Sequence, residues 1–468
     1  MSTRSTAGPG TKVAKAWSSG KRRLKRLYWQ IHSVCAIYTG GFLAFILITG
    51  AFAVYAPEVY DWEFRHDARV EAAAFDPGVL PDAIERATAR LREETPGATA
   101  YQVRYPKSET HSIRVKFSNQ DFRPKPFVPG QPWVLRTVFV HPSTGEILGE
   151  ADDDRSVASF LRNVHVRIFA GTPGRNLVGL FGISLLIISF SGLLILAQFL
   201  GRRSLWLVRR SNARATNSDV HKIIGFVLIV PLLIFAVTGF WLGMQVHLMR
   251  WFDIERPGAF SREALISPQE DQTYPIDFGR AARAARAAHP RLIVQQITWS
   301  TDGERHLRVQ GRTPRMVYER LSQSVVLDKN DYSVLTVVDT PNSRLGEKLF
   351  FLQEALHFGD FAGAPGKALY LVIGLLLGVL PLTGYAIQRL RSRSSLVPFW
   401  RWTALGCAYF VGLLWLLKAQ GVVVASSWST VLLLLLLAFL VRWITRWIRR
   451  LIARAKGSRK PEVRPEAT

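Results

Sequence analysis

Long apolar segments alternate with charged stretches along this chain. Four of these segments contain no Asp, Glu, Lys or Arg: residues 31–56, 176–200, 223–249 and 368–388. Each of the four is long enough for the roughly 20 residues that a membrane-spanning helix requires. Two further apolar runs, 403–417 and 422–441, are expected to form a final helical hairpin. The pattern predicts an α-helical integral membrane protein with about six spans.

Basic residues cluster beside these segments. Residues 1–30, 201–222, 389–401 and the tail from 442 hold 27 Lys and Arg against three acids, whereas the rest of the chain holds 33 bases against 32 acids. By the positive-inside rule the basic side is cytoplasmic, so both termini are expected there. Because the clusters flank apolar spans, contact with anionic lipid of the bilayer is the simpler explanation, and no nucleic-acid partner is expected.

The first apolar segment is longer than the about 7–15 residues of a signal-peptide core, so it is expected to remain as an anchor. The predicted organisation is a basic cytoplasmic N-terminus (1–30), a first span (31–56), a periplasmic module (57–165), a second span (174–200), a cytoplasmic loop (201–222), a third span (223–249), a second periplasmic module (250–365), a fourth span (366–388), fifth and sixth spans (402–418 and 422–441) and a basic cytoplasmic tail (442–468).

Each periplasmic module has a helical pattern followed by alternating apolar and polar runs separated by turn residues. This order predicts two α+β modules, each a short helix with a few antiparallel strands. Neither contains a nucleophile elbow, a phosphate loop or a cysteine cluster with metal spacing, which favours a binding or docking role. The two cysteines, Cys35 and Cys407, fall in or near spans, and no Cys-x-x-Cys-His motif for covalent haem occurs.

One stretch occurs twice. Residues 165–179 read HVRIFAGTPGRNLVG and residues 357–371 read HFGDFAGAPGKALYL, with His, Phe-Ala-Gly, Pro-Gly, a basic residue and Leu at identical offsets. A second pair, His32 and His221, precedes Thr-Gly by 17 residues in both cases, at Thr49 and Thr238. The sequence therefore indicates a tandem duplication with a two-span repeat.

Four histidines thus occupy corresponding places in the two repeats. An ionisable ring close to hydrocarbon is costly and usually functional, and neutral imidazole is a preferred ligand of haem iron. If equivalent residues face each other across a pseudo-twofold axis, His32 pairs with His221 and His165 with His357. This predicts two b-type haems with bis-histidine ligation. His247 is an alternative ligand at the outer face.

Taken singly, each histidine could instead be an interfacial residue bonded to backbone, but the paired spacing favours ligation. His66, His111, His141, His289 and His306 are expected on the surface of the modules. Seven glycines could let either helices or a porphyrin approach closely, and both interpretations stay open: Gly40, Gly41, Gly179, Gly182, Gly225, Gly374 and Gly378. Pro173-Gly174 and Pro365-Gly366 are expected to turn the chain from a surface helix into a span.

The four histidine motifs resemble those of the PepSY-associated transmembrane family of bacterial inner-membrane proteins, and residues 76–150 and 274–339 resemble PepSY modules. That family includes iron-regulated membrane proteins and ferric-siderophore reductases. The resemblance implies electron transfer from the cytoplasmic side, through haem b, to a ferric siderophore or other Fe(III) chelate in the periplasm. No flavin or nicotinamide motif occurs, so the donor would be a separate protein or the quinol pool. The alternative is a non-redox PepSY scaffold that acts as a sensor or as a partner-binding or regulatory protein.

Overall fold

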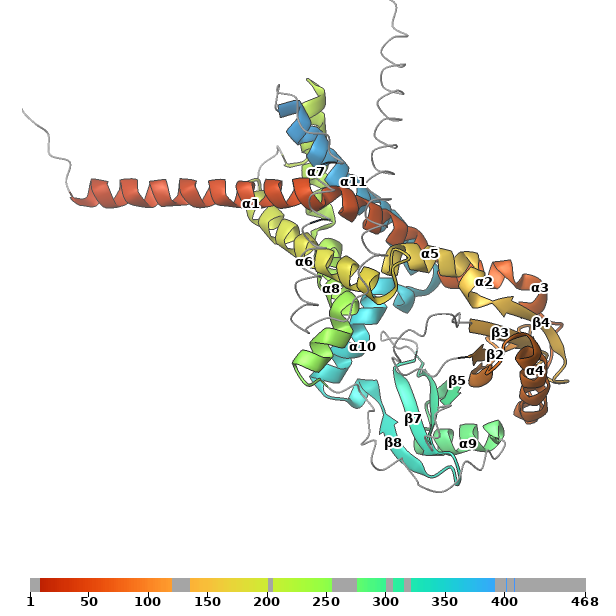
Figure 1. Cartoon of the computed structure of the whole chain (residues 1–468). Coiled ribbons are helices and arrows are strands. Elements are labelled where there is room, and N and C mark those ends of the chain that lie inside the picture. Colours follow the sequence, from red (N-terminus) through yellow and green to blue (C-terminus); the bar gives the residue numbers. More distant parts are fainter. Residues whose placement is uncertain are drawn as a thin grey trace, which may run out of the picture. The chain divides into compact units, whose positions relative to one another are not determined.

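A computed structural model describes residues 9–119, 135–200, 205–254, 276–299, 306–314 and 321–391, together with Arg401 and Ala408. The chain divides into two compact units (Figure 1). We call Met1–Ala51, Val164–Leu248 and Val372–Thr468 the membrane unit, and Phe52–Asn163 and Met249–Leu371 the sheet unit. Apart from Ala408, the predicted fifth and sixth spans, 402–418 and 422–441, lie outside the described residues.

Long helices build the membrane unit. They are α1 (Pro9–Ala53), α6 (Gly171–Leu196), α7 (Ala213–Val227), α8 (Ile229–Trp251) and α11 (Gly363–Arg391), the last of which begins in the sheet unit. Within the described residues, four stretches are long and apolar enough to cross a membrane: Arg23–Ala53, Gly171–Leu196, Ile229–Trp251 and Asp360–Arg391. These correspond to the first four predicted spans.

The third predicted span is broken at Leu228, which separates α7 from α8. Pro231 explains the break, because it has no N–H for the Val227 carbonyl and its ring crowds that carbonyl. At the N-terminus, α1 starts at Pro9, so the helix continues well before the apolar segment that begins at Ile31.

The turn into the second span lies before the Pro-Gly pair, not at it. After α5 (Val157–Val166) the chain turns at Ile168 and Phe169, whose φ angles are 44° and 57°. Pro173 lies in the first turn of α6, where its missing N–H is tolerated. A Cβ at Gly174 would lie 1.8 Å from the Arg167 carbonyl oxygen, so this glycine allows the turn to pack against the helix start.

Four of the seven glycines serve helix packing. Gly179 and Gly182 of α6 lie against the backbone of α8, and Gly374 and Gly378 of α11 lie against α1, so that an added Cβ would come within 2.5–2.8 Å of the neighbouring helix. Gly225 has nothing within 4 Å. Close helix contact is therefore the role of these four positions, as is usual for small residues in membrane helices.

The sheet unit contains one eight-stranded antiparallel sheet in the order β4-β3-β2-β1-β5-β6-β7-β8. Its strands are β1 (Thr99–Arg104), β2 (Ile113–Ser118), β3 (Leu135–Val140), β4 (Ile147–Asp152), β5 (Ile293–Trp299), β6 (His306–Arg312), β7 (Gln323–Asp328) and β8 (Val334–Val338). Its helices are α2 (Ala56–Glu63), α3 (Arg65–Ala68), α4 (Leu80–Glu94), most of α5, α9 (Phe278–Ala288) and α10 (Leu345–Phe358). In each predicted module one helix, α4 or α9, is followed by four strands, β1–β4 or β5–β8.

The two modules join edge to edge through β1 and β5, with Val103 opposite Ile297. Both strands carry a bulge, between Ala100 and Gln102 in the β1–β2 pair and between Val294 and Gln296 in the β5–β6 pair. These bulges lie at the same distance from the central pair, so the two modules share the register irregularity that bends a strand.

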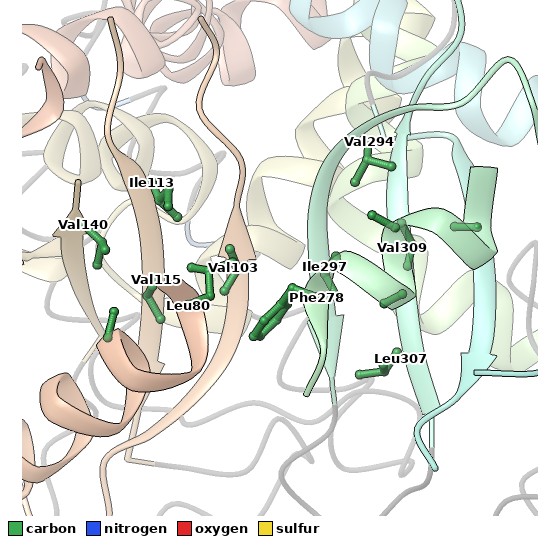
Figure 2. Packing of buried hydrophobic residues seen from close by; sticks show 14 of the residues in the cluster. Leu80, Val103, Ile113, Val115, Val140, Phe278, Val294, Ile297, Leu307 and Val309 are labelled. Carbon is green, nitrogen blue, oxygen red and sulfur yellow. The ribbon is translucent and has the colours of Figure 1, made fainter. Parts of the chain in front are cut away.

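The helices α4 and α9 cover one face of the sheet. The apolar residues of α4 recur every three or four positions at Leu80, Ala83, Ala87 and Leu91, which places them on one helix face. Together with Phe278 of α9 and the inward residues of both sets of strands, they form one core (Figure 2). Burial of this continuous core is the main stabilisation of the unit.

The predicted surface location is wrong for His289. Only 6% of it is exposed, and its Nε2 atom lies 3.1 Å from Gln323 Oε1. His289 is the C-cap residue of α9, and its ring is buried beside Gln323 at the start of β7.

Candidate cofactor site

Two histidines face each other inside the membrane unit. His32 lies on α1 and His221 on α7, and their ring centroids are 6.2 Å apart with an interplanar angle of 83°. They are separated by 189 positions in sequence. The structure therefore brings together the first pair that the sequence predicted.

Each of these rings is held by a neighbouring helix. His32 Nδ1 lies 3.0 Å from the Ile188 carbonyl oxygen and 3.2 Å from Ser191 Oγ, both on α6. His221 Nδ1 lies 3.1 Å from the Leu380 carbonyl oxygen and 2.9 Å from Thr383 Oγ1, both on α11. The same pair of acceptors, a carbonyl and a hydroxyl three residues later, orients each ring.

These contacts determine which nitrogen of each ring carries the proton. A carbonyl oxygen can only accept, so Nδ1 must be the N–H donor in both rings. In a neutral imidazole the proton on Nδ1 leaves a lone pair on Nε2. Neither Nε2 atom makes a hydrogen bond with any residue that the structure describes. Both rings therefore present the tautomer that metal-ligating histidines adopt, with the other nitrogen bonded to a carbonyl.

The spacing of the two rings fits a bound metal. Imidazole nitrogens bind metals at about 2 Å, and each nitrogen lies about 1 Å from its ring centre, so two axial imidazoles place their centres about 6 Å apart. The observed 6.2 Å agrees with this value. Within the described residues no group of three or more His, Cys, Asp or Glu could hold a metal by itself. Two histidines suffice for haem, because the macrocycle supplies the remaining ligands.

A glycine leaves room for each of the rings. A Cβ at Gly192 would lie 3.2 Å from His32 Cε1, and a Cβ at Gly384 would lie 3.4 Å from His221 Cε1. Each glycine follows the residue whose hydroxyl contacts the ring. The same arrangement, a hydroxyl residue followed by glycine, thus lies beside each ring, at Ser191-Gly192 and at Thr383-Gly384.

His165, at the end of α5, makes a similar contact with α1. Its Nδ1 atom lies 3.0 Å from the Ile46 carbonyl oxygen, and a Cβ at Gly50 would lie 2.7 Å from its Cε1 atom. Burial lowers the pKa of His165 to about 4, although the Ile46 carbonyl acts in the opposite direction. The ring is therefore neutral at physiological pH, as a metal ligand must be.

The two residues of the second predicted pair, His165 and His357, belong to different units. His357 lies at the end of α10 in the sheet unit, where its ring contacts Phe358 edge-on at 5.5 Å between centroids and Gly359 ends the helix with φ 69°. His247 is buried on α8 in the membrane unit, with 7% exposure. The assignment of His165, His357 and His247 as outer ligands stays a prediction.

An ion cluster that the sequence did not indicate lies next to His221. Asp219 is almost fully buried and accepts hydrogen bonds from the Nε, Nη2 and backbone N–H groups of Arg209 at 2.9–3.0 Å and from Lys222 Nζ at 3.1 Å. These partners hold the pKa of Asp219 far below its usual range, the Arg209 side chain being the largest cause. The cluster attaches the preceding loop to the start of α7. Asp219, the one acid among the bases of that loop, was the available signal.

The comparison with known families agrees with this architecture. The model of the PepSY-associated TM region matches residues 29–391. The chain belongs to this family. The match covers most of the first candidate span, the other three spans and both modules of the sheet unit, so the protein is a multi-pass membrane protein with PepSY-like α+β modules.

Among curated proteins, the chain is similar to an uncharacterized protein of Pseudomonas aeruginosa. It is 38% identical over 79 residues, which is 17% of this chain and 20% of the relative. The match spans about a fifth of that protein's length, so it concerns a segment and not the whole architecture.

Proposed function

We propose that this protein is a haem-b electron-transfer protein of the bacterial inner membrane that reduces a ferric siderophore or another Fe(III) chelate on the periplasmic side. The observation that carries the proposal is the His32–His221 pair, with two ring centroids 6.2 Å apart and each Nδ1–H donated to a carbonyl oxygen. A b-type haem between them would supply an iron that gains and loses one electron. The sensor or scaffold alternative offers no reason for this geometry.

The chain's own residues would hold and insulate this centre. His32 and His221 would hold the haem iron, and Ser191 and Thr383 would orient their rings. Hydrogen bonds donated by Nδ1–H make the imidazoles more basic, which stabilises oxidised iron, so these contacts would tune the reduction potential. His165 and His357, or His247 in place of one of them, would form a second centre nearer the periplasm. Two centres would divide the membrane crossing into shorter electron transfers.

The direction of insertion follows from charge. The Arg209–Asp219 cluster belongs to a loop with six bases and one acid, which we place in the cytoplasm together with both termini. We also propose that two further spans follow residue 401 and that the chain contains a duplicated two-span repeat. A periplasmic reporter enzyme fused after Arg210 should be inactive, and an active fusion would invert the topology.

Spectroscopy of the purified full-length protein tests the function. Protein from haem-replete cells should show a Soret band and the sharp reduced bands of low-spin bis-histidine haem, with about two non-covalent haems per chain. Dithionite-reduced protein mixed anaerobically with ferric citrate should be reoxidised, while gallium citrate, which accepts no electron, serves as the control. Absence of a Soret band would overturn the proposal and leave the scaffold role.

A further inference from the structure

Arg104, the last residue of β1, lies next to the junction of the two modules. In the sheet it is opposite Arg114 of β2 on one side and Gln296 of β5 on the other. Residues paired in this way project on the same face. Val103, its neighbour, contributes to the core beneath α4 and α9, so Arg104 projects on the opposite face.

The cations around Arg104 form ion pairs with acids, whereas Asp153 acts on Arg104 only through its charge. Arg114 Nη2 lies 2.6 Å from Asp61 Oδ1, and Lys116 Nζ lies 2.8 Å from Asp153 Oδ2. The Arg104 side chain is exposed and makes no ion pair or hydrogen bond with the residues that the structure describes. Lys107 also contacts Asp61, so four cations surround two carboxylates. The cluster has an excess of about two positive charges.

Pairing of these strands does not require a positive charge at Arg104. Like charges directly opposite each other on neighbouring strands are destabilising. At the equivalent place in the second module, Thr298 of β5 is opposite Arg308 of β6, so an uncharged residue satisfies the same strand geometry. The Arg104–Arg114 pair therefore opposes folding and calls for a different explanation.

Lys116 lies close enough to Arg104 and Arg114 for their charges to affect its pKa. Burial lowers this pKa, and the charges of Arg104 and Arg114 lower it further, while Asp153 acts in the opposite direction. A bound anion would relieve this repulsion. The guanidinium of Arg114 has five N–H donors, of which Nη2 contacts Asp61, and it lies against the ring of Tyr60 at 5.3 Å.

We propose that Arg104 and Arg114 form a binding site for a small anion that carries at least two carboxylates. The planar fork of a guanidinium matches a carboxylate through two parallel hydrogen bonds. Side chains directly opposite on antiparallel strands have Cβ atoms about 5 Å apart, which suits two carboxylates on one short carbon chain. The excess of about two charges matches a dianion. The identification of this anion with the ligand of a ferric chelate rests on the proposed function.

Calorimetric titration of the full-length protein in neutral detergent tests the site, with citrate as the probe. Arg104→Gln should weaken citrate binding about 10- to 100-fold, since a hydrogen-bonded charge is lost. Arg90→Gln is the matched control, because Arg90 makes an exposed ion pair with Glu150 and belongs to α4 on the other face of the sheet. That variant should bind citrate as the unsubstituted protein does.

The outcomes separate this site from the proposed function. Equal citrate affinity in the Arg104→Gln and unsubstituted proteins would overturn the site, as would absence of citrate binding. Binding of inorganic phosphate or of phosphatidylglycerol vesicles that depends on Arg104, without citrate binding, would assign the cluster to phosphates instead. The haem spectrum is recorded on the same samples. A chain that binds citrate through Arg104 but contains no haem retains the site and loses the electron-transfer role.

Discussion

His32 and His221 lie with their rings nearly perpendicular and 6.2 Å apart, although 188 residues separate them in the chain. Each ring is fixed by a different helix, His32 by α6 and His221 by α11. The geometry depends on four helices at once, so it belongs to the folded bundle and not to any single segment.

Substitution of either histidine should remove the same centre. His32→Ala and His221→Ala are each expected to lose one of two haems, and the double variant should lose no more than either single one, because residues that share a partner are not additive. Reduced-minus-oxidised spectra and pyridine haemochrome counts measure the loss. His141→Ala, in a turn of the sheet unit, should retain the full spectrum. A double variant that loses twice as much would place the two histidines at separate centres.

Gly50 should be intolerant of a side chain. In Gly50→Ala the new methyl would come within 2.7 Å of His165 Cε1, and that buried ring is held by the Ile46 carbonyl. Overpacking of this kind typically costs about 1–3 kcal/mol, so the melting temperature should fall by several degrees. If His165 is a ligand, the spectrum of the outer centre should also change.

Gly225→Ala is the control for this experiment, since nothing lies within 4 Å of that glycine and alanine favours a helix. It should melt at or above the temperature of the unsubstituted protein. Equal melting temperatures for the Gly50 and Gly225 variants would show that the His165 ring moves freely, against the packing described above.

Sequence spacing located the important residues but did not show which of them are in contact. The interval from His32 to Thr49-Gly50 repeats at His221, yet 17 residues of helix rise about 26 Å, so the two ends of one interval cannot touch. In the structure Gly50 instead faces His165, and His32 is bonded to Ser191. Residue intervals measure distance along a helix, whereas contacts depend on which helices are neighbours.

The first four spans and the two α+β modules could be predicted from the sequence because each has its own periodicity of apolar residues. The pairing of β1 with β5, which joins the two modules into one sheet, could not be predicted. An alternating pattern shows that a segment is a strand but not which strand lies beside it. The break at Leu228 could have been predicted from Pro231. The apolar segment 223–249 continues through this position without a charged residue, which concealed the break.

Asp219→Asn should weaken the attachment of the cytoplasmic loop. Loss of one ionised partner from a buried, hydrogen-bonded group typically costs about 1–3 kcal/mol. The pKa of Asp219 is lower in the folded protein than its unfolded value of about 3.9, so its stabilisation is fully present above that value and decreases as the pH falls below it. The variant and the unsubstituted protein should therefore differ in melting temperature by a constant amount from pH 6 to 8. The difference should narrow below about pH 4, and a difference that already disappears at pH 6 would contradict the ion cluster.

The junction of the two modules should depend on Ile297. Its side chain is fully buried opposite Val103, where the core beneath α4 continues into the core beneath α9 (Figure 2). Ile297→Ala removes methyl groups and leaves a cavity, which in well-packed cores costs about 2–5 kcal/mol. Ile293 lies on the same strand with 43% exposure, so Ile293→Ala is a matched control and should change stability by no more than about 0.5 kcal/mol.

Chemical unfolding of the full-length protein, monitored by tryptophan fluorescence, compares the two variants. Because the core is continuous across β1 and β5, Ile297→Ala should lower the midpoint of one transition that includes both modules. Two separate transitions, with only the second module destabilised, would show that the modules fold independently and that the β1–β5 pairing adds little to their stability.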